Sequence, residues 1–231
     1  MTGVQTCALP ISAGLSAYLD TIAFARQSGL LTIGDIKRGD IGSTAEAYAQ
    51  AHLGPNGADA VTINPYLGSD SLLPFINAAA ATGRGLFILV KTSNPSASEI
   101  QDLVADGQPI YAHVARLVER LGAPHVDSSG YSLAGAVVGA TQKDCAASLR
   151  QLMPHAIILA PGYGAQGATA QDCAACFHPN GLGAVVNSSR GITFAWETEP
   201  YKSRFGPSRW REAIAAAVID MKNSLEAVRC P

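Results

Sequence analysis

The chain has 231 residues, of which 48% are hydrophobic and 15% charged, and its formal net charge is −2 at pH 7. This composition fits one globular domain with a sizeable core. The near-neutral charge, without a Lys/Arg run, argues against a nucleic-acid surface or an anionic membrane as partner. No apolar stretch reaches the roughly 18 residues that a membrane span needs.

The first twelve residues differ in pattern from the rest. Thr2–Ser12 reads TGVQTCALPIS, shows neither helical nor alternating periodicity, and resembles the translation of a sequencing-library adapter. An amphipathic pattern begins abruptly at Ala13. We therefore expect a non-native leader over residues 1–12 and a single domain over residues 13–231.

From Ala13 the chain alternates helical and strand-like segments, which is typical of a parallel sheet wrapped by helices. Near-continuously apolar runs predict six strands, at Leu30–Ile36, Ala58–Asn64, Leu86–Thr92, Ala134–Ala140, Ala156–Ala160 and Gly183–Asn187. Helical spacing predicts helices over Ala13–Ser28, from about Thr44, and over Ser71–Ala81, Pro109–Leu121, Lys143–Leu152, Ala168–Phe177 and Ser208–Arg229. Ser43 and Glu46 fit a capping box for the helix from Thr44.

Six strands are two fewer than a (β/α)₈ TIM barrel contains. An open doubly wound α/β sheet is the alternative, although no G-x-G-x-x-G follows the first strand to support it. The strand count leaves both architectures open, and the residues at the strand ends must decide between them.

Nearly every predicted strand ends in a small polar or Gly/Pro cluster, and β/α barrels build their active sites from such ends. The clearest cluster is Asp35-Ile-Lys37-Arg-Gly-Asp40. Asp35 and Lys37 are two apart, so on a strand they would point to the same face. Two carboxylates beside a lysine can repel a substrate carboxylate while the lysine holds a proton ready. The alternative is a surface salt bridge at a strand tip.

A second cluster suggests anion recognition. Asn187-Ser-Ser-Arg190 ends the last strand, where barrels often bind phosphate, and Arg190 can offer a bidentate fork to phosphate oxygens. The glycine-rich loop Pro161–Gly167 precedes it by one unit and can close over a ligand. An ordinary βα loop is the alternative.

The cysteines and histidines give little sign of metal chemistry. The five cysteines are an odd number in a chain of this size, which predicts a reducing, cytoplasmic location. Cys173 and Cys176 form a C-x-x-C, but no second pair completes a zinc site, so packing is favoured over a redox or metal role. The five histidines are scattered without ligand spacing, and no metal site is predicted.

Six motifs together carry a family resemblance. In order across Asp35–Ile192 the chain reads DIKRGDIGST, ADAVTINPYLG, VKTSNP, AVVGAT, APGYGAQG and NSSRGI. This set resembles orotidine 5′-phosphate decarboxylase, in the branch with D-x-K-R-G-D-I-G-S-T. The resemblance implies a (β/α)₈ barrel, a homodimer with shared active sites, and cofactor-free, metal-free conversion of orotidine 5′-phosphate to UMP in pyrimidine biosynthesis.

The resemblance also assigns roles to individual residues. Lys37 would protonate C6, with Asp35 facing the departing carboxylate. The remaining positions are implied as substrate-binding or shared residues: Asp40, Ile41 and Thr44 in the partner subunit's site, Ser93 at the pyrimidine, Gln166 and Arg190 at the 5′-phosphate, and Pro161 in the mobile loop. Many relatives have Gly before the arginine, where this chain has Ser189.

The front of the chain departs from the family pattern. The family begins with a strand bearing a ribose-contacting Asp and a second strand bearing a Lys of the charged array, whereas the first predicted strand here matches the third. We therefore expect a partial β/α barrel over residues 13–231, with about six strands and at best low activity. Two alternatives stay open: a non-catalytic fragment that binds a phosphate ligand, and a Mg²⁺-dependent sugar-phosphate decarboxylase or aldolase of the same superfamily.

Overall fold

The computed structural model describes residues 12–164 and 166–229. The predicted leader therefore lies outside the described residues, except for Ser12, the first residue of helix α1. The described chain contains one six-stranded parallel sheet in the order β1-β2-β3-β6-β7-β8. Its strands are β1 (Ile33–Arg38), β2 (Ala60–Ile63), β3 (Gly85–Lys91), β6 (Ala134–Val138), β7 (Ile158–Pro161) and β8 (Ala184–Asn187).

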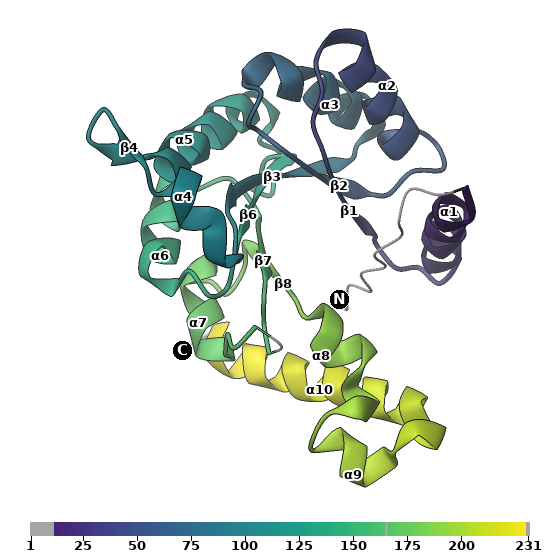
Figure 1. Cartoon of the computed structure of the whole chain (residues 1–231). Coiled ribbons are helices and arrows are strands. Elements are labelled where there is room, and N and C mark those ends of the chain that lie inside the picture. Colours follow the sequence, from purple (N-terminus) through teal and green to yellow (C-terminus); the bar gives the residue numbers. More distant parts are fainter. Residues whose placement is uncertain (1–11, 165, 230–231) are drawn as a thin grey trace.

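The sheet is curled like part of a barrel, and helices cover its convex side (Figure 1). The helices of this layer are α2 (Gly42–Leu53), α3 (Ser69–Thr82), α5 (Ile110–Gly122), α6 (Lys143–Leu152) and α7 (Ala170–Cys173). Helix α1 (Ser12–Gln27) stands beside β1 and α2, with the Arg26 guanidinium donating to the Gly57 carbonyl at 2.6 Å. The partial α/β barrel with about six strands is thus confirmed.

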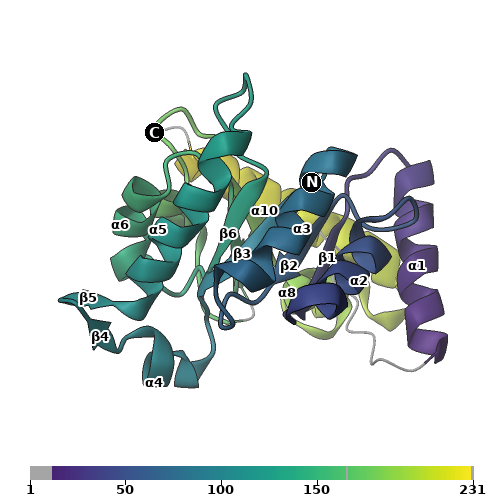
Figure 2. The same ribbon diagram turned by 90° about the horizontal axis from the view of Figure 1, so that it is seen from above.

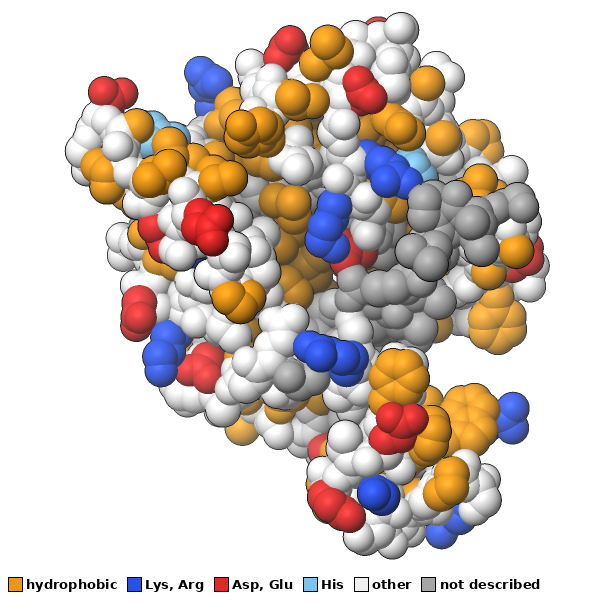
Figure 3. Space-filling view, in the orientation of Figure 1, with side chains coloured by type: hydrophobic (Ala, Val, Ile, Leu, Met, Phe, Trp, Pro, Cys, Tyr) orange, Lys and Arg blue, Asp and Glu red, His pale blue; other side chains and the backbone are white. Residues whose placement is uncertain are grey.

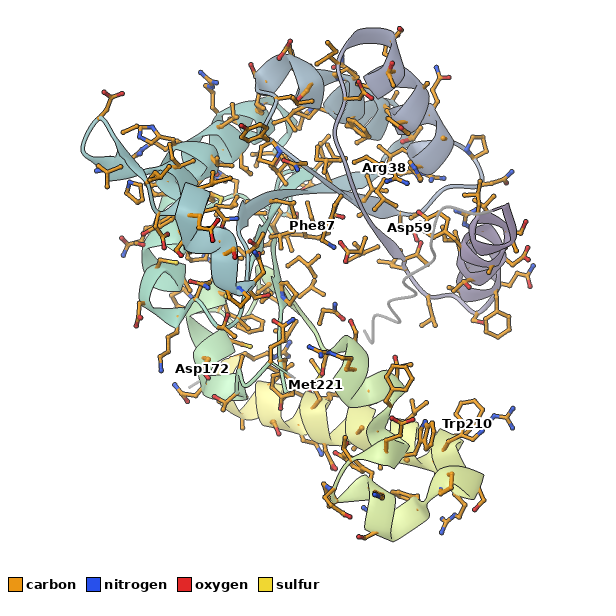
Figure 4. The ribbon with its side chains drawn as sticks, in the orientation of Figure 1. Arg38, Asp59, Phe87, Asp172, Trp210 and Met221 are labelled. Atoms are coloured by element: carbon orange, nitrogen blue, oxygen red, sulfur yellow. The ribbon has the colours of Figure 1, made fainter. Side chains whose placement is uncertain are left out.

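Successive residues of each strand point to opposite faces of the sheet, and apolar side chains are packed on both faces. In β3, Leu86, Ile88 and Val90 are buried in the large core between sheet and helices. Phe87 of the same strand joins a second cluster on the concave side, with Val137 and Leu159, which are only 5–7% exposed. Phe87 points into this concave side in Figure 4.

Two segments extend the barrel unit. Between β3 and α5, the short helix α4 (Ser98–Gln101) and the hairpin β4 (Val104–Ala105) and β5 (Gln108–Pro109) project from the body (Figure 2). After β8, α8 (Ser189–Thr193), α9 (Tyr201–Phe205) and the long α10 (Trp210–Arg229) form an arm with its own small core of Ala195, Ala213 and Ala217. Within the described residues, no helix is long and apolar enough to cross a membrane.

The structure corrects some local predictions. The first strand begins three residues later than predicted and continues to Arg38. The capping box of Ser43 and Glu46 is wrong: α2 begins at Gly42, its N-cap is Ile41, and no side chain caps it. A capping box is found instead at α7, where the side chains of Thr169 and Asp172 accept reciprocally from each other's backbone N–H. The hairpin β4–β5 was not predicted.

Candidate active site

The polar strand ends meet at the carboxyl edge of the sheet. Backbone hydrogen bonds of 2.8 Å join these ends from strand to strand: Asn64 N–H to the Arg38 carbonyl, Gly139 N–H to the Lys91 carbonyl, and Ala140 N–H to the Pro161 carbonyl. Pro161 in turn pairs with Asn187 across β7 and β8. The strand ends that carry or precede the predicted site residues therefore lie along one rim, the place where barrels build their active sites. Figure 3 shows the concave side hollowed, with acidic and basic side chains beside apolar ones.

Asp35 and Lys37 lie on β1, at one end of this rim. The Lys37 ammonium lies 2.5 Å from Asp35 Oδ2, and the two side chains are 21% (Asp35) and 50% (Lys37) exposed. The pair is thus half-buried and accessible from the concave side. This geometry places an ammonium, a potential proton donor, beside a carboxylate on one accessible face, as the motif predicts.

The backbone at Lys37 is not that of a regular strand. Lys37 has a φ of 49°, in the left-handed region, which costs a residue with a side chain about 1–3 kcal/mol. The pairing of β1 with β2 is irregular at the same place: four steps from Gly34 to Arg38 match only two steps from Val61 to Ile63. Asp35 and Lys37 share a face as predicted, but a bulge rather than simple alternation brings them together.

Thr62 was not predicted and lies in direct contact with this pair. Its hydroxyl is fully buried, accepts from the Lys37 backbone N–H at 3.0 Å and donates to Asp35 Oδ1 at 2.8 Å. Its neighbours Val61 and Ile63 belong to the outer core, so Thr62 faces the concave side. A single polar residue at an inward position of the apolar strand Ala-Val-Thr-Ile was the sequence signal for it.

Arg38, the next residue along β1, turns to the opposite side. Its guanidinium lies 5.7 Å from the ring centroid of Tyr48 on α2, and Figure 4 shows it among the outer helices. Arg38 therefore anchors the end of β1 to the helix layer, whereas Lys37 of the same strand lies on the concave side.

Asp40, Ile41 and Thr44 follow in the loop and first turn after β1. The Asp40 carboxylate accepts from the Ile41 N–H at 2.8 Å, and Ile41 is 59% exposed. Thr44 is exposed as well. The structure thus places these three residues next to the Asp35–Lys37 pair in the chain, but the described contacts tie none of them to it.

Ser93 is held at the end of β3 by its surroundings. A Cβ on Gly139 would lie 2.9 Å from the Ser93 Cβ, so the serine packs against bare backbone. The Thr92 N–H donates to the Gln101 side chain at 2.9 Å, which fastens α4 to this strand end. Beside them the buried Lys91 pairs with Asp102, and its ammonium lies 5.3 Å from the Tyr111 ring centroid. These supporting residues were not predicted either.

The predicted phosphate-binding residues occupy two joined loops. Gln166 lies over Gly162, where a Cβ would be 2.8 Å from its Oε1. The Ser188 hydroxyl donates to the Tyr163 carbonyl at 2.9 Å, which links the loop after Pro161 to the end of β8. Arg190 on α8 is exposed and forms no ion pair with a carboxylate of residues 12–164 or 166–229.

The C-x-x-C pair has the environment of packed core. Cys173 and Cys176 are fully buried, and burial raises their pKa values to about 12 and about 11. Thiols of this kind are poor nucleophiles and poor metal ligands at neutral pH. In the part of the chain that the structure describes, no group of three or more His, Cys, Asp or Glu could hold a metal ion.

The comparisons with known proteins agree with this geometry. The sequence profile of the Orotidine 5′-phosphate decarboxylase / HUMPS family matches residues 8–199. A protein of Rhodopirellula baltica named orotidine 5′-phosphate decarboxylase is 48% identical over 221 residues, which cover 93% of this chain and 73% of that protein. Its namesake in Petrotoga mobilis is 42% identical over 94% of this chain and 74% of its own length.

Solved structures support the same assignment. The structure of Leishmania donovani OMP decarboxylase superimposes with a TM-score of 0.74 at 30% identity, covering 94% of this chain and 76% of that one. The fold, the six ordered motifs, the family profile and these relatives agree, and the chain belongs to the orotidine 5′-phosphate decarboxylase family.

Proposed function

We propose that this protein decarboxylates orotidine 5′-phosphate to UMP, with Lys37 as the proton donor to C6 and without a cofactor. The observation that carries the proposal is the Asp35–Lys37 pair, 2.5 Å apart and accessible at the carboxyl edge of the sheet. The family and the names of its relatives supply the substrate. Neither alternative is favoured, because the relatives at 40–48% identity are orotidine 5′-phosphate decarboxylases.

The proposed reaction uses the two charges of the pair in sequence. A substrate carboxylate placed beside Asp35 is repelled, and this repulsion is relieved when the C6–carboxylate bond breaks and CO₂ departs. The electron pair left on C6 then takes a proton from the Lys37 ammonium, which lies on the same face. Lys37 ends the cycle neutral and regains its proton from water.

The other site residues bind the rest of the nucleotide in this proposal. Ser93 contacts the pyrimidine from the end of β3. Gln166 and Arg190 hold the 5′-phosphate, for which an exposed guanidinium that forms no ion pair in residues 12–164 and 166–229 is well suited. Pro161 begins the loop that carries Gln166 and shapes its course.

A turnover assay tests the proposed function. We expect the purified chain to convert orotidine 5′-phosphate to UMP and CO₂, followed by release of labelled CO₂, with the same rate in the presence of EDTA. A rate that EDTA abolishes and Mg²⁺ restores would instead support the metal-dependent sugar-phosphate enzyme. A folded chain that binds UMP but shows no turnover would support the non-catalytic fragment.

We further propose a homodimer in which Asp40, Ile41 and Thr44 complete the partner subunit's site. Exposed apolar side chains support an interface at the carboxyl edge, because exposed apolar surface often marks an association site. They follow β1, β2 and β3 and comprise Ile41, Tyr66, Leu67, Ile100, Leu103 and Val104, which are 47–79% exposed.

We also propose a cytoplasmic location. The free thiols of Cys145, Cys173 and Cys176 fit such a reducing environment.

Subunit mixing tests the shared site. Asp40→Ala and Lys37→Ala chains are each expected to be nearly inactive, whereas their mixture should regain activity. The reason is symmetry: in each heterodimer one site receives both defects and the other receives none. Turnover is measured after the subunits have exchanged. A mixture that forms heterodimers yet stays inactive would show that Asp40 serves its own subunit.

A further inference from the structure

We propose that Thr62 is a positioning residue for the reaction, which holds the Asp35–Lys37 pair in its reactive arrangement; this inference rests on the proposed function. The Thr62 hydroxyl accepts from the Lys37 backbone N–H at 3.0 Å and donates to Asp35 Oδ1 at 2.8 Å. The other carboxylate oxygen, Oδ2, contacts the Lys37 ammonium at 2.5 Å. One hydroxyl thereby fixes the backbone of the proton donor and the side chain of its partner.

The directions of these hydrogen bonds are fixed by chemistry. A hydroxyl has one proton to donate and lone pairs to accept with, whereas a backbone N–H can only donate and an ionised carboxylate can only accept. The Thr62 hydroxyl must therefore accept the hydrogen bond from the Lys37 N–H and donate its own hydrogen bond to Asp35. No rotation of the hydroxyl satisfies both partners in another way, so the arrangement is unique.

The backbone geometry explains why Lys37 needs this support. Its φ of 49° is unfavourable for a residue with a side chain, and such a conformation persists only where neighbours hold it. The bulge in β1 removes regular ladder bonds at this point, since four residue steps of β1 face two of β2. The Thr62 hydroxyl stands in for a ladder acceptor and takes up the Lys37 N–H.

Burial makes the support rigid. Thr62 is 0% exposed, so water does not compete for its hydroxyl. A β-branched side chain also has few rotamers in a strand, and the hydroxyl direction is set by packing. Asp35 Oδ1 is consequently held at a fixed place, and Oδ2 with it. Catalytic groups held in this way are preorganised, so little free energy is needed to rearrange them when the substrate binds.

The same two strands offer a matched control at their other end. The Thr32 hydroxyl donates to Asp59 Oδ2 at 2.8 Å, and the Asp59 N–H donates to the Thr32 hydroxyl at 3.2 Å. This second Thr–Asp pair also joins the segments of β1 and β2, but at the amino edge of the sheet, and Figure 4 shows Asp59 there. Removing either threonine hydroxyl would weaken the contact between the two strands, whereas of these two threonines only Thr62 contacts Lys37.

The experiment compares Thr62→Val, Thr62→Ser and Thr32→Val in the full chain. Thr62→Val keeps the branched shape and removes the hydroxyl, so we expect kcat to fall roughly 10- to 100-fold, with KM changed less than about threefold. Thr62→Ser keeps the hydroxyl and should retain kcat within about threefold of the wild type. Thr32→Val should leave kcat unchanged.

A second readout needs no turnover. Amide hydrogen exchange of Lys37, measured by NMR, should be slow in the wild type and in Thr62→Ser and Thr32→Val, and at least about tenfold faster in Thr62→Val. If Thr62→Val does not fold by circular dichroism, Thr62→Ala carries the same expectations. A wild-type protein without turnover would contradict the proposed function. The exchange rate of the Lys37 amide would still show whether Thr62 holds the Lys37 backbone.

Three results would overturn the proposal. The first is wild-type turnover in Thr62→Val. The second is a Lys37 amide that exchanges equally fast in the wild type and in Thr62→Val. The third is an equal loss of kcat in Thr62→Val and Thr32→Val, which would reduce Thr62 to a general link between two strands.

Discussion

Replacement of Lys37 with alanine is expected to abolish nearly all turnover. Proton delivery by a positioned acid alone contributes about 10²–10⁴-fold, so kcat should fall by at least that factor. The substitution also removes the contribution of the electrostatic field that Lys37 and Asp35 create together, since the ammonium lies 2.5 Å from the carboxylate. Steady-state kinetics with orotidine 5′-phosphate measures it, and KM should change far less than kcat.

Lys222 provides the control for this substitution. It lies on α10, its side chain is 69% exposed, and its only described ion pair is with Glu226 at 3.8 Å. Lys222→Ala removes the same charge from a remote surface and should leave kcat unchanged. Lys37→Arg adds a second comparison, because a guanidinium stays protonated and should not replace the ammonium as acid. Near wild-type turnover in Lys37→Ala would refute its assignment as proton donor.

Replacement of Arg190 with alanine is expected to weaken UMP binding by about 1.5–3 kcal/mol, the contribution of a hydrogen bond to a charged group. The guanidinium is exposed at the end of β8 and pairs with no carboxylate of residues 12–164 or 166–229, so a phosphate would be its main partner. Isothermal titration calorimetry with UMP measures the change.

Uridine distinguishes phosphate recognition from general damage. It lacks the phosphate, so Arg190→Ala should leave its affinity nearly unchanged. Arg211→Ala is the matched control, because Arg211 is an exposed arginine at the start of α10, where it stacks on Trp210 at 4.8 Å. Equal losses of affinity for UMP and uridine would place Arg190 outside the phosphate site.

The elements of the barrel could be predicted because their sequence patterns are strong and local. Strands covered on both faces read as continuous apolar runs, and each of the six predicted runs overlaps one strand of the sheet. Helix α6 was predicted to the residue, since Thr141 and Gln142 precede Lys143–Leu152 and Pro154 follows it as a helix stop signal. The boundaries of β1 were predicted less well, because its polar end continues the strand through Asp35 and Lys37.

Local patterns failed where a neighbouring segment decides the conformation. Ser43 and Glu46 have the spacing of a capping box, yet α2 begins at Gly42, whose φ of 51° lets the chain turn sharply after the loop. The hairpin β4–β5 has only two residues in each strand, too few for an alternating pattern to be visible. Such features depend on loop geometry rather than on periodicity.

The sequence by itself determined the order of the elements, the family through six ordered motifs, and the residue types at the strand ends. Only the tertiary structure decided how Asp35 and Lys37 meet. Their contact depends on a bulge in β1 and on the hydroxyl of Thr62, which is 25 residues from Lys37 and 27 from Asp35 in the chain. Hydrogen bonds across a sheet join residues that no local pattern relates, so their partners are known only once the strands are paired in register.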